Sequence, residues 1–301
     1  MKTLFAALIV LASCHQAYAS QGPGDENPPT ANPFKLFSME CDQAEEGLDT
    51  TPQSPPLDVD DPGTPGCNTF EANIVFNGEF SKDGEFSKKS SSLELPLLDL
   101  NYGIGDNLQL KYEIPFIRNS EDGHVTTGFG NSEIGVKWMF LDDPERSLEA
   151  ALYPQVEFNT SSHAIEEEGI ADEGTVLSLP ILVSKKLGST SEGDVMLTAN
   201  FAYNRVFSGE DSDTVFAGLG VGAPLFSNKV AVMAEIVTEQ ATSRDEEGVR
   251  ENLIKMDLAF KGPITEHISA FATVGRSLHT SEDHPITYGV IGLQLIFGGT
   301  E

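Results

Sequence analysis

Apolar and polar residues alternate along most of the chain from residue 69 onward. In residues 131–140, every second side chain is apolar, at Ile134, Val136, Trp138 and Phe140. Successive side chains of a β-strand point to opposite faces, so this alternation predicts strands with one apolar and one polar face. Twelve segments follow the pattern, namely 69–81, 90–101, 108–116, 130–141, 148–159, 174–185, 194–207, 214–225, 230–240, 250–261, 267–277 and 286–297.

The length and spacing of these segments indicate a barrel. Each has about nine to fourteen residues, which is the length that a tilted strand needs to cross a bilayer. Loops that average about ten residues alternate with turns that average about six, although the loop 208–213 is shorter than the turn 186–193. Long loops on one side, short turns on the other and an even number of strands are typical of outer-membrane barrels.

The predicted fold class is therefore all-β, a transmembrane antiparallel up-and-down β-barrel of about 12 strands over residues 69–301. A soluble sandwich or lipocalin-like barrel, with its apolar face inward, is the alternative. The segments are longer than the five or six residues typical of soluble strands, and charges and glycines on the polar faces suit a wet lumen. We expect a protein of the Gram-negative outer membrane, surrounded by lipid and inserted by the barrel-insertion machinery.

The amino terminus has the pattern of an export signal. Lys2 is followed by the apolar run Leu4–Ala12, and a small-x-small motif ends at Ala19. This order predicts a signal peptide over residues 1–19, cleaved after Ala19. A lipobox that ends at Cys14 offers a second interpretation, in which this cysteine is lipidated. The sequence leaves both processing routes open.

Residues 20–68 differ from the rest in composition. They hold nine of the 17 prolines and ten acidic residues against one basic residue. A segment of this kind buries too little apolar surface to fold by itself, so we expect a disordered, mostly extended acidic leader in the periplasm. Cys41 and Cys67 should form a disulfide in that oxidising compartment. Asp58, Asp60 and Asp61 lack the later ligands of a calcium loop, and we interpret them as a turn or latch at the barrel mouth.

Two stretches resemble a known family. Residues 56–65, which read PLDVDDPGTP, are similar to the motif that precedes the barrel in the phenol meta-pathway degradation family. Residues 128–143, which read GFGNSEIGVKWMFLDD, resemble the central strand and turn of that family and are the more specific match. The resemblance covers roughly residues 56–297. It implies an outer-membrane barrel of a transporter-like family.

Charge limits the partners of this protein. Lys and Arg number 18 against 47 Asp and Glu, which leaves a net charge of −29 and argues against nucleic acid as a partner. We recognise no motif for a cofactor, a metal ion or catalysis, and we expect no enzyme. Charged residues on the polar faces of the strands are candidates for lining the lumen. They are Lys111, Glu113, Glu133, Lys137, Glu149, Glu157, Glu235, Lys255 and Asp257.

Two functions are compatible with such a barrel. The first is a passive channel or transporter for a small solute, hydrophobic or aromatic solutes included. The alternative is a structural or surface-interaction barrel without transport activity. Barrels of about eight strands have filled interiors and those of sixteen or more have open channels, so a twelve-stranded barrel is compatible with both.

The mass of the exported protein tests the predicted processing. Cleavage after Ala19 should leave a chain whose thiols resist alkylation until a reductant is added, after which two labels are incorporated. Intact-mass spectrometry reads both results. A mass with a lipid on Cys14 would support the lipobox, and two labels without reduction would contradict the Cys41–Cys67 bridge.

Overall fold

The computed structural model describes residues 33–37, 41, 48–82, 89–121, 123–168, 170–171, 174–207, 212–227, 229–244, 250–281 and 285–298. The signal peptide of residues 1–19, with its cleavage position at Ala19 and the lipobox at Cys14, lies outside these residues. Within the described part of the chain, no helix is long and apolar enough to cross a membrane.

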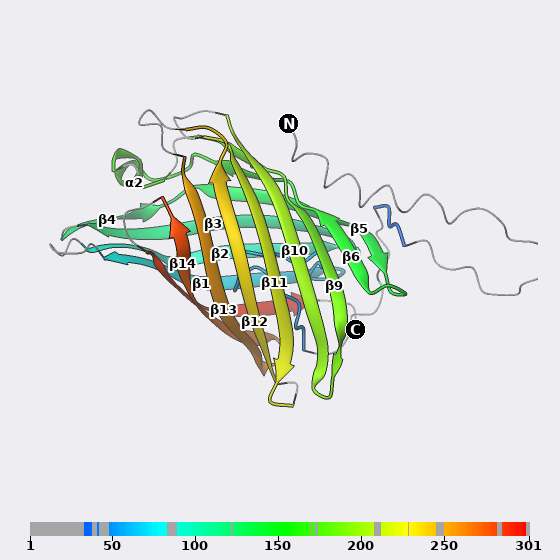
Figure 1. Cartoon of the computed structure of the whole chain (residues 1–301). Coiled ribbons are helices and arrows are strands. Elements are labelled where there is room, and N and C mark those ends of the chain that lie inside the picture. The colour runs from blue at the N-terminus through cyan, green and yellow to red at the C-terminus, as the bar shows by residue number, and fades with distance from the viewer. Residues whose placement is uncertain are drawn as a thin grey trace, which may run out of the picture. The chain divides into compact units, whose positions relative to one another are not determined.

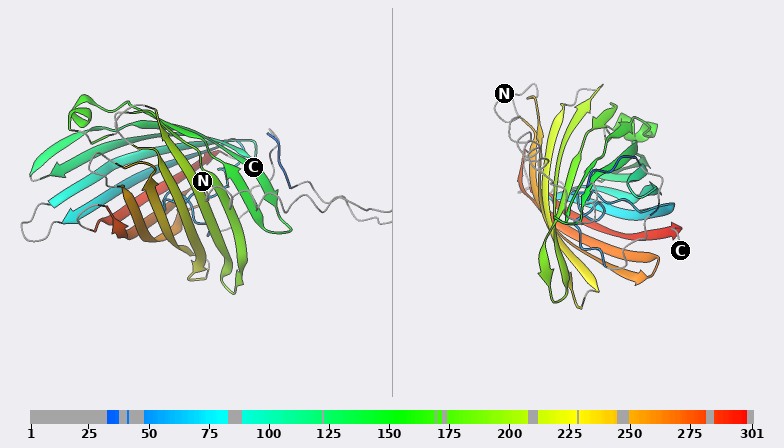
Figure 2. Two further views of the ribbon diagram at one scale, coloured as in Figure 1. Left: turned by 45° about the horizontal axis from the view of Figure 1, so that its top comes forward. Right: turned by 90° about the vertical axis from the view of Figure 1, so that its right-hand side faces the viewer.

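The described residues form one antiparallel sheet whose first and last strands pair, so that the sheet closes into a barrel (Figures 1 and 2). Its strands are β1 (Thr69–Lys82), β2 (Lys89–Ile104), β3 (Leu108–Glu121), β4 (His124–Phe129), β5 (Ser132–Asp143), β6 (Leu148–Leu152), β7 (Gln155–Phe158), β8 (Val176–Ser178), β9 (Ile181–Thr190), β10 (Gly193–Val206), β11 (Thr214–Leu225), β12 (Val230–Ala241), β13 (Asn252–Thr265), β14 (Ile268–Thr280) and β15 (Thr287–Gly298). β1 pairs with β15 from Thr69–Gly298 to Phe80–Thr287. A short helix, α2 (His163–Glu167), lies between β7 and β8.

Three of the barrel strands are each interrupted by two residues. β4 with β5, β6 with β7, and β8 with β9 each follow one line in the wall, so the described residues make twelve barrel strands. Pro154 and Pro180 stand at two of the breaks, where proline cannot donate a ladder hydrogen bond. The backbone N–H of Tyr153 still donates to the Pro180 carbonyl at 3.1 Å, which keeps these neighbours in register. The predicted twelve-stranded up-and-down barrel is confirmed.

The two ends of the barrel carry different connections. Turns of two to four residues join the strands at one end, and connections of two to 17 residues join them at the other. The predicted turn 186–193 shrinks to residues 191–192, because β9 and β10 extend to meet at Thr190 and Gly193. Short turns face the periplasm in outer-membrane barrels, and the start of β1 and the end of β15 lie at that end.

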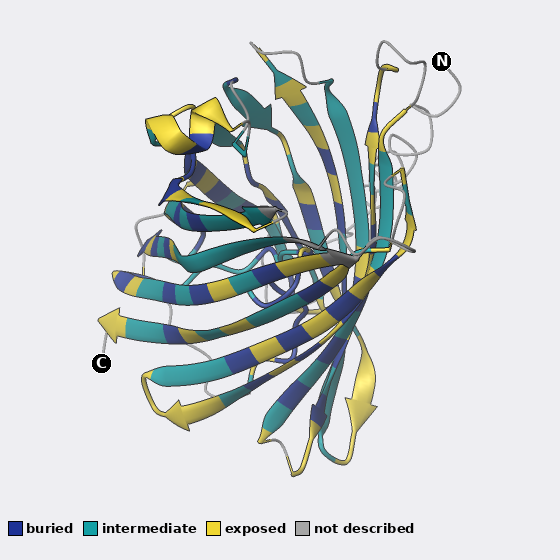
Figure 3. Cartoon of the chain, turned by 90° about the vertical axis from the view of Figure 1, so that its left-hand side faces the viewer, coloured by how far each residue is buried: buried dark blue, intermediate teal, exposed yellow. Residues whose placement is uncertain are grey.

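The outer face of the barrel is apolar and the inner face is polar. Leu110, Ile236 and Val274 point outward and keep 45%, 46% and 58% of their surface exposed. Asn73 and Thr198 face inward and are fully buried. Figure 3 shows the resulting bands of buried and exposed residues along the strands. An apolar outer face is stable in lipid, so the structure excludes the soluble alternative, whose apolar face would point inward.

Residues 48–66, here called the lumenal segment, lie inside the barrel. Pro52, Val59 and Pro62 are fully buried, and the side chains of Leu57 and Val59 pack against small and apolar residues of β12 and β13. Parts of this segment are visible within the ring of strands in Figures 2 and 3. This differs from the extended leader that the sequence predicts for residues 20–68. The difference arises because the barrel supplies the apolar and hydrogen-bonding partners that the segment itself lacks.

Glycines of β11 let the lumenal segment approach the wall closely. Gly220 and Gly222 face the lumen, and a Cβ atom at Gly222 would lie 1.9 Å from the Thr50 carbonyl oxygen. A Cβ atom at Gly220 would lie 2.8 Å from Val59. A side chain at either position would therefore displace the segment from β11.

The described leader residues outside the lumen are also held by the barrel. The Lys35 N–H donates to the Phe140 carbonyl and the Asp142 N–H donates to the Pro33 carbonyl, both at 2.9 Å, so residues 33–35 extend the sheet beside the end of β5. The predicted disulfide between Cys41 and Cys67 is present. The lumenal segment is thus fixed covalently at the start of β1.

The closed barrel predicts a characteristic electrophoretic behaviour. The folded protein should remain in the outer-membrane fraction and migrate faster in an unheated gel sample than in a boiled one, because the hydrogen-bonded barrel resists detergent. A boiled aliquot of the same preparation is the control. Recovery of the folded protein as a soluble periplasmic monomer would contradict the membrane barrel.

Candidate functional site in the barrel lumen

The barrel encloses a cavity of about 1130 Å³ between the lumenal segment and the inner wall. Polar and charged side chains dominate its lining, and twelve acidic residues stand against four lysines. The acidic residues are Asp49, Asp58, Asp60, Asp61, Glu71, Glu79, Glu94, Asp99, Glu113, Glu235, Asp257 and Glu266, and the lysines are Lys111, Lys137, Lys255 and Lys261. The interior is therefore an acidic space, partly filled by the lumenal segment.

Glu235 of β12 holds the lumenal segment through its backbone. Its two carboxylate oxygens accept hydrogen bonds from the N–H groups of Asp58 at 2.9 Å and Val59 at 2.8 Å. Glu235 is 3% exposed, so both hydrogen bonds form in a buried site away from water. One wall residue thus satisfies two consecutive backbone donors that the segment buries.

Neutral side chains of other strands bind the same segment. The side-chain amide of Asn200 accepts from the Asp60 N–H at 2.6 Å and donates to the Asp60 carbonyl at 2.7 Å, as a neighbouring strand would. The Thr273 hydroxyl donates to the Pro56 carbonyl at 2.8 Å. Thr64 in turn donates to the carbonyl of Asp106 at 3.0 Å, in the turn between β2 and β3. The segment is therefore fixed to several parts of the wall.

Two lysines pair with the acidic side chains of the lumenal segment. Lys137 of β5 is 3% exposed and lies 3.0 Å from the Asp60 carboxylate, and it also donates to the Asp61 carbonyl at 2.9 Å. Lys255 of β13 lies 2.7 Å from the carboxylate of Asp58. Removal of one partner of the buried Lys137–Asp60 pair should cost about 3–5 kcal/mol, because it leaves the other charge buried and unpaired. The Lys255–Asp58 pair contributes less, because the Asp58 side chain is 40% exposed and water screens it.

The Asp61 carboxyl contributes less to the contact with Lys137. Burial raises the pKa of Asp61 to about 8, although the Lys137 ammonium opposes this shift. The side chain lies 4.0 Å from the ammonium, farther than that of Asp60, and accepts a hydrogen bond from the Gly63 N–H. At neutral pH, Lys137 therefore pairs chiefly with Asp60.

The structure brings six of the nine predicted lumen residues to the cavity. Lys111 lies 2.8 Å from both Glu113 and Glu133, and this trio connects β3 to β5. Glu157 accepts a hydrogen bond from Asn131 at 2.9 Å, and Glu149 is half-buried on β6. The cavity lining includes Lys111, Glu113, Lys137, Glu235, Lys255 and Asp257 and does not include Glu133, Glu149 and Glu157.

Several cavity residues were missed by the sequence analysis. Glu79, Glu94 and Asp99 of β1 and β2 line the cavity, and alternation along these strands could have identified them. The lumenal segment was missed as well. One sequence feature does indicate this segment, namely the run GLGVG at residues 218–222 of β11. Glycine at every second position of a strand allows another backbone to approach that face closely.

The fold is similar to that of outer-membrane channels. An outer membrane channel from Pseudomonas putida F1 matches with a TM-score of 0.66 and 12% identity, over 80% of this chain and 100% of that chain. The NanC porin matches with a TM-score of 0.50 and 8% identity, over 74% of this chain and 98% of that chain. No family model matches the sequence, and no curated protein matches it. At such identities the likeness shows the fold alone.

The bonds at Glu235 predict how the lumenal segment opens. With Leu57→Cys as a buried reporter, Glu235→Ala should speed maleimide labelling about 10- to 100-fold, since each of its two hydrogen bonds contributes about 0.5–1.5 kcal/mol and each 1.4 kcal/mol is tenfold. Glu239→Ala is the matched control, because Glu239 lies on the same face of β12 and contacts Thr214. Equal labelling rates in the two variants would show that Glu235 does not hold the segment.

Proposed function

We propose that the protein is a passive outer-membrane channel for small solutes, in which the lumenal segment narrows the passage. The observation that supports it best is the cavity of about 1130 Å³, because a barrel with a purely structural role has no need for an unfilled, polar interior. The lumenal segment limits the size of molecules that pass, since it occupies the lumen beside β10, β11, β12 and β13.

The charge of the cavity favours cations and neutral molecules over anions. Acidic side chains outnumber lysines by twelve to four in the lining. Each of the four lysines already contacts a carboxylate or amide oxygen of the wall or of the lumenal segment. The low-dielectric walls of a cavity focus the field of the charges that line it. The negative potential inside this cavity should therefore raise the local concentration of cations.

The lining of the cavity supports a class of solute. Leu97, Ile117 and Phe216 line the same cavity as the acidic residues. We therefore propose a small neutral or cationic molecule that carries an apolar or aromatic part.

A structural or surface-interaction barrel is the second candidate. The observation that favours it is the dense anchoring of the lumenal segment, which carries direct bonds to β5, β10, β12, β13 and β14. If this segment never leaves its place and the space around it does not connect the two ends, no solute passes.

Conductance in planar bilayers separates the two candidates. The wild type should conduct, and deletion of residues 48–66 should raise the single-channel conductance several-fold, because the lumen widens. If the deletion variant does not fold, Glu235→Ala combined with Lys255→Gln replaces it. No conductance in the wild type and in a folded variant with a released segment would favour the structural barrel.

Reversal potentials in a salt gradient test the selectivity. The wild type should prefer cations, and the preference should shrink as salt rises, since the Debye length falls. Glu166→Lys, Glu167→Lys and Glu168→Lys together should weaken it, because these exposed residues stand at the end of the barrel with the longer connections. The matching triple change to Gln should have a smaller effect. A salt-insensitive preference for anions would contradict the proposed selectivity.

A further inference from the structure

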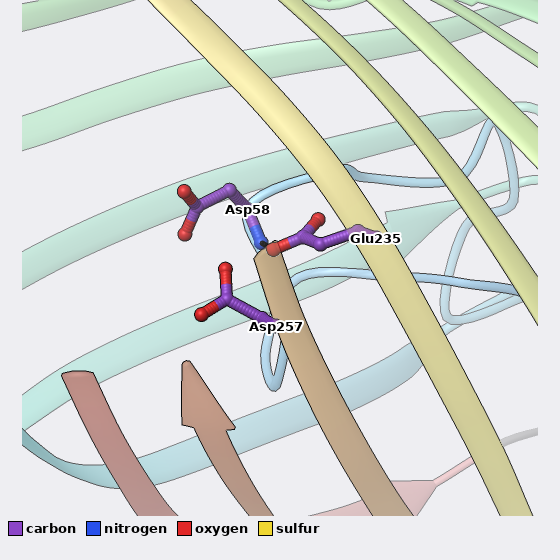
Figure 4. Close-up of side chains that lie close together, drawn as sticks. All are labelled: Asp58, Glu235 and Asp257. Carbon is purple, nitrogen blue, oxygen red and sulfur yellow. Dashed lines mark hydrogen bonds between the residues drawn. The ribbon is translucent and has the colours of Figure 1, made fainter. Parts of the chain in front are cut away.

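Three carboxylates from distant parts of the chain meet beside the lumenal segment. They belong to Asp58 of that segment, Glu235 of β12 and Asp257 of β13, and one oxygen of each lies within 4.8 Å of the others (Figure 4). Glu235 and Asp257 are direct partners in the β12–β13 ladder. Like charges directly opposite each other destabilise a sheet, so this arrangement requires a counter-charge.

Asp257 is the residue that points to a ligand. Its side chain is buried, with 3% of its surface exposed, and neither carboxylate oxygen has a hydrogen-bond partner among the described residues. Figure 4 shows its carboxylate directed toward Asp58. Buried polar groups are almost always hydrogen-bonded, and the one ion pair of Asp257, from Oδ2 to Lys255, leaves Oδ1 without a partner among the described residues.

Lys255 supplies part of the counter-charge. Its ammonium lies 2.7 Å from the Asp58 carboxylate and 3.5 Å from Asp257 Oδ2, with its closer contact to the lumenal segment. When all three carboxyl groups are ionised, the cluster and the Lys255 ammonium together carry a formal charge of −2. One divalent cation would balance that charge.

We propose that Asp58, Glu235 and Asp257 bind one calcium ion, which joins the lumenal segment to β12 and β13. Carboxylate oxygens are the ligands that hard divalent cations prefer. Calcium takes its oxygen ligands at about 2.3–2.6 Å in a flexible geometry, whereas magnesium demands a near-ideal octahedron at about 2.0–2.1 Å, so carboxylates that lie within 4.8 Å of one another on three separate elements suit calcium better.

The hydrogen bonds of Glu235 are compatible with this site. Each carboxylate oxygen carries two lone pairs, so an oxygen that accepts from the N–H of Asp58 or Val59 can also face a cation. The ligands come from residues 58, 235 and 257, and no linear calcium motif could reveal them. The ion would add a third kind of contact to the backbone hydrogen bonds and ion pairs that hold the segment.

Terbium luminescence tests the site in the folded full-length protein. Tb³⁺ replaces Ca²⁺, and Tyr288 can sensitise it, because its ring lies 4.4 Å from the Lys255 ammonium. We expect saturable emission at one site that Ca²⁺ displaces. Asp257→Asn should weaken Tb³⁺ binding at least tenfold. Asp99→Asn is the matched control, since Asp99 is also buried and faces the lumen but is hydrogen-bonded by Asn73 and Asn101.

A second measurement reports how often the lumenal segment opens. Ca²⁺ should slow maleimide labelling of Leu57→Cys severalfold, EDTA should reverse the effect, and Asp257→Asn should abolish it. Heat-modifiable gel mobility shows that each variant is folded. Absence of saturable Tb³⁺ emission in the wild type would contradict the proposed calcium site. An equal loss of Tb³⁺ affinity in Asp257→Asn and Asp99→Asn would also contradict it. Because neither readout uses conductance, failure here leaves the channel proposal intact, and the reverse also holds.

Discussion

The carboxylate of Glu235, which accepts two consecutive backbone N–H groups, is central to this structure. A segment that enters a barrel must satisfy its buried backbone donors, and it has no strand of its own to do so. Glu235 and the amide of Asn200 take that role for residues 58–60. The ion pairs of Lys137 and Lys255 depend on the position that these bonds give to the segment. The size and charge of the cavity depend in turn on the position of the lumenal segment.

The wall of the barrel could be predicted from the sequence because its signal is local. Alternation with a period of two identifies a strand regardless of its partners, which is why residues such as Ile134 and Trp138 sufficed for β5. The turn between β9 and β10 was misplaced for a related reason. Residues 186–193 are rich in Gly, Ser and Thr, which favour turns, yet pairing with β10 extends β9 to Thr190.

The lumenal segment could not be predicted from its own residues, because its fold depends on distant partners. Asp58 and Val59 bind a residue more than 170 positions away, and Pro56 binds one 217 positions away. Its proline-rich, acidic sequence is typical of disorder, and burial becomes favourable when Lys137, Glu235 and Lys255 line the same space. The candidate site could therefore be predicted only in part. Alternation along the strands identifies the charged residues of the wall, but it does not identify their partners in the lumenal segment.

The disulfide between Cys41 and Cys67 determines how force would travel through the molecule. Residues 41–67 form a covalent ring that contains the whole lumenal segment and ends two residues before β1 begins. Tension applied to the chain before Cys41 passes across the sulfur bridge to Cys67 and into the barrel wall. It does not pull on residues 48–66. A partner that draws on the amino terminus would load β5 first, through residues 33–35, and then β1 through the disulfide. The lumenal segment could therefore leave the lumen only as a closed loop, since pulling on the amino terminus cannot straighten it.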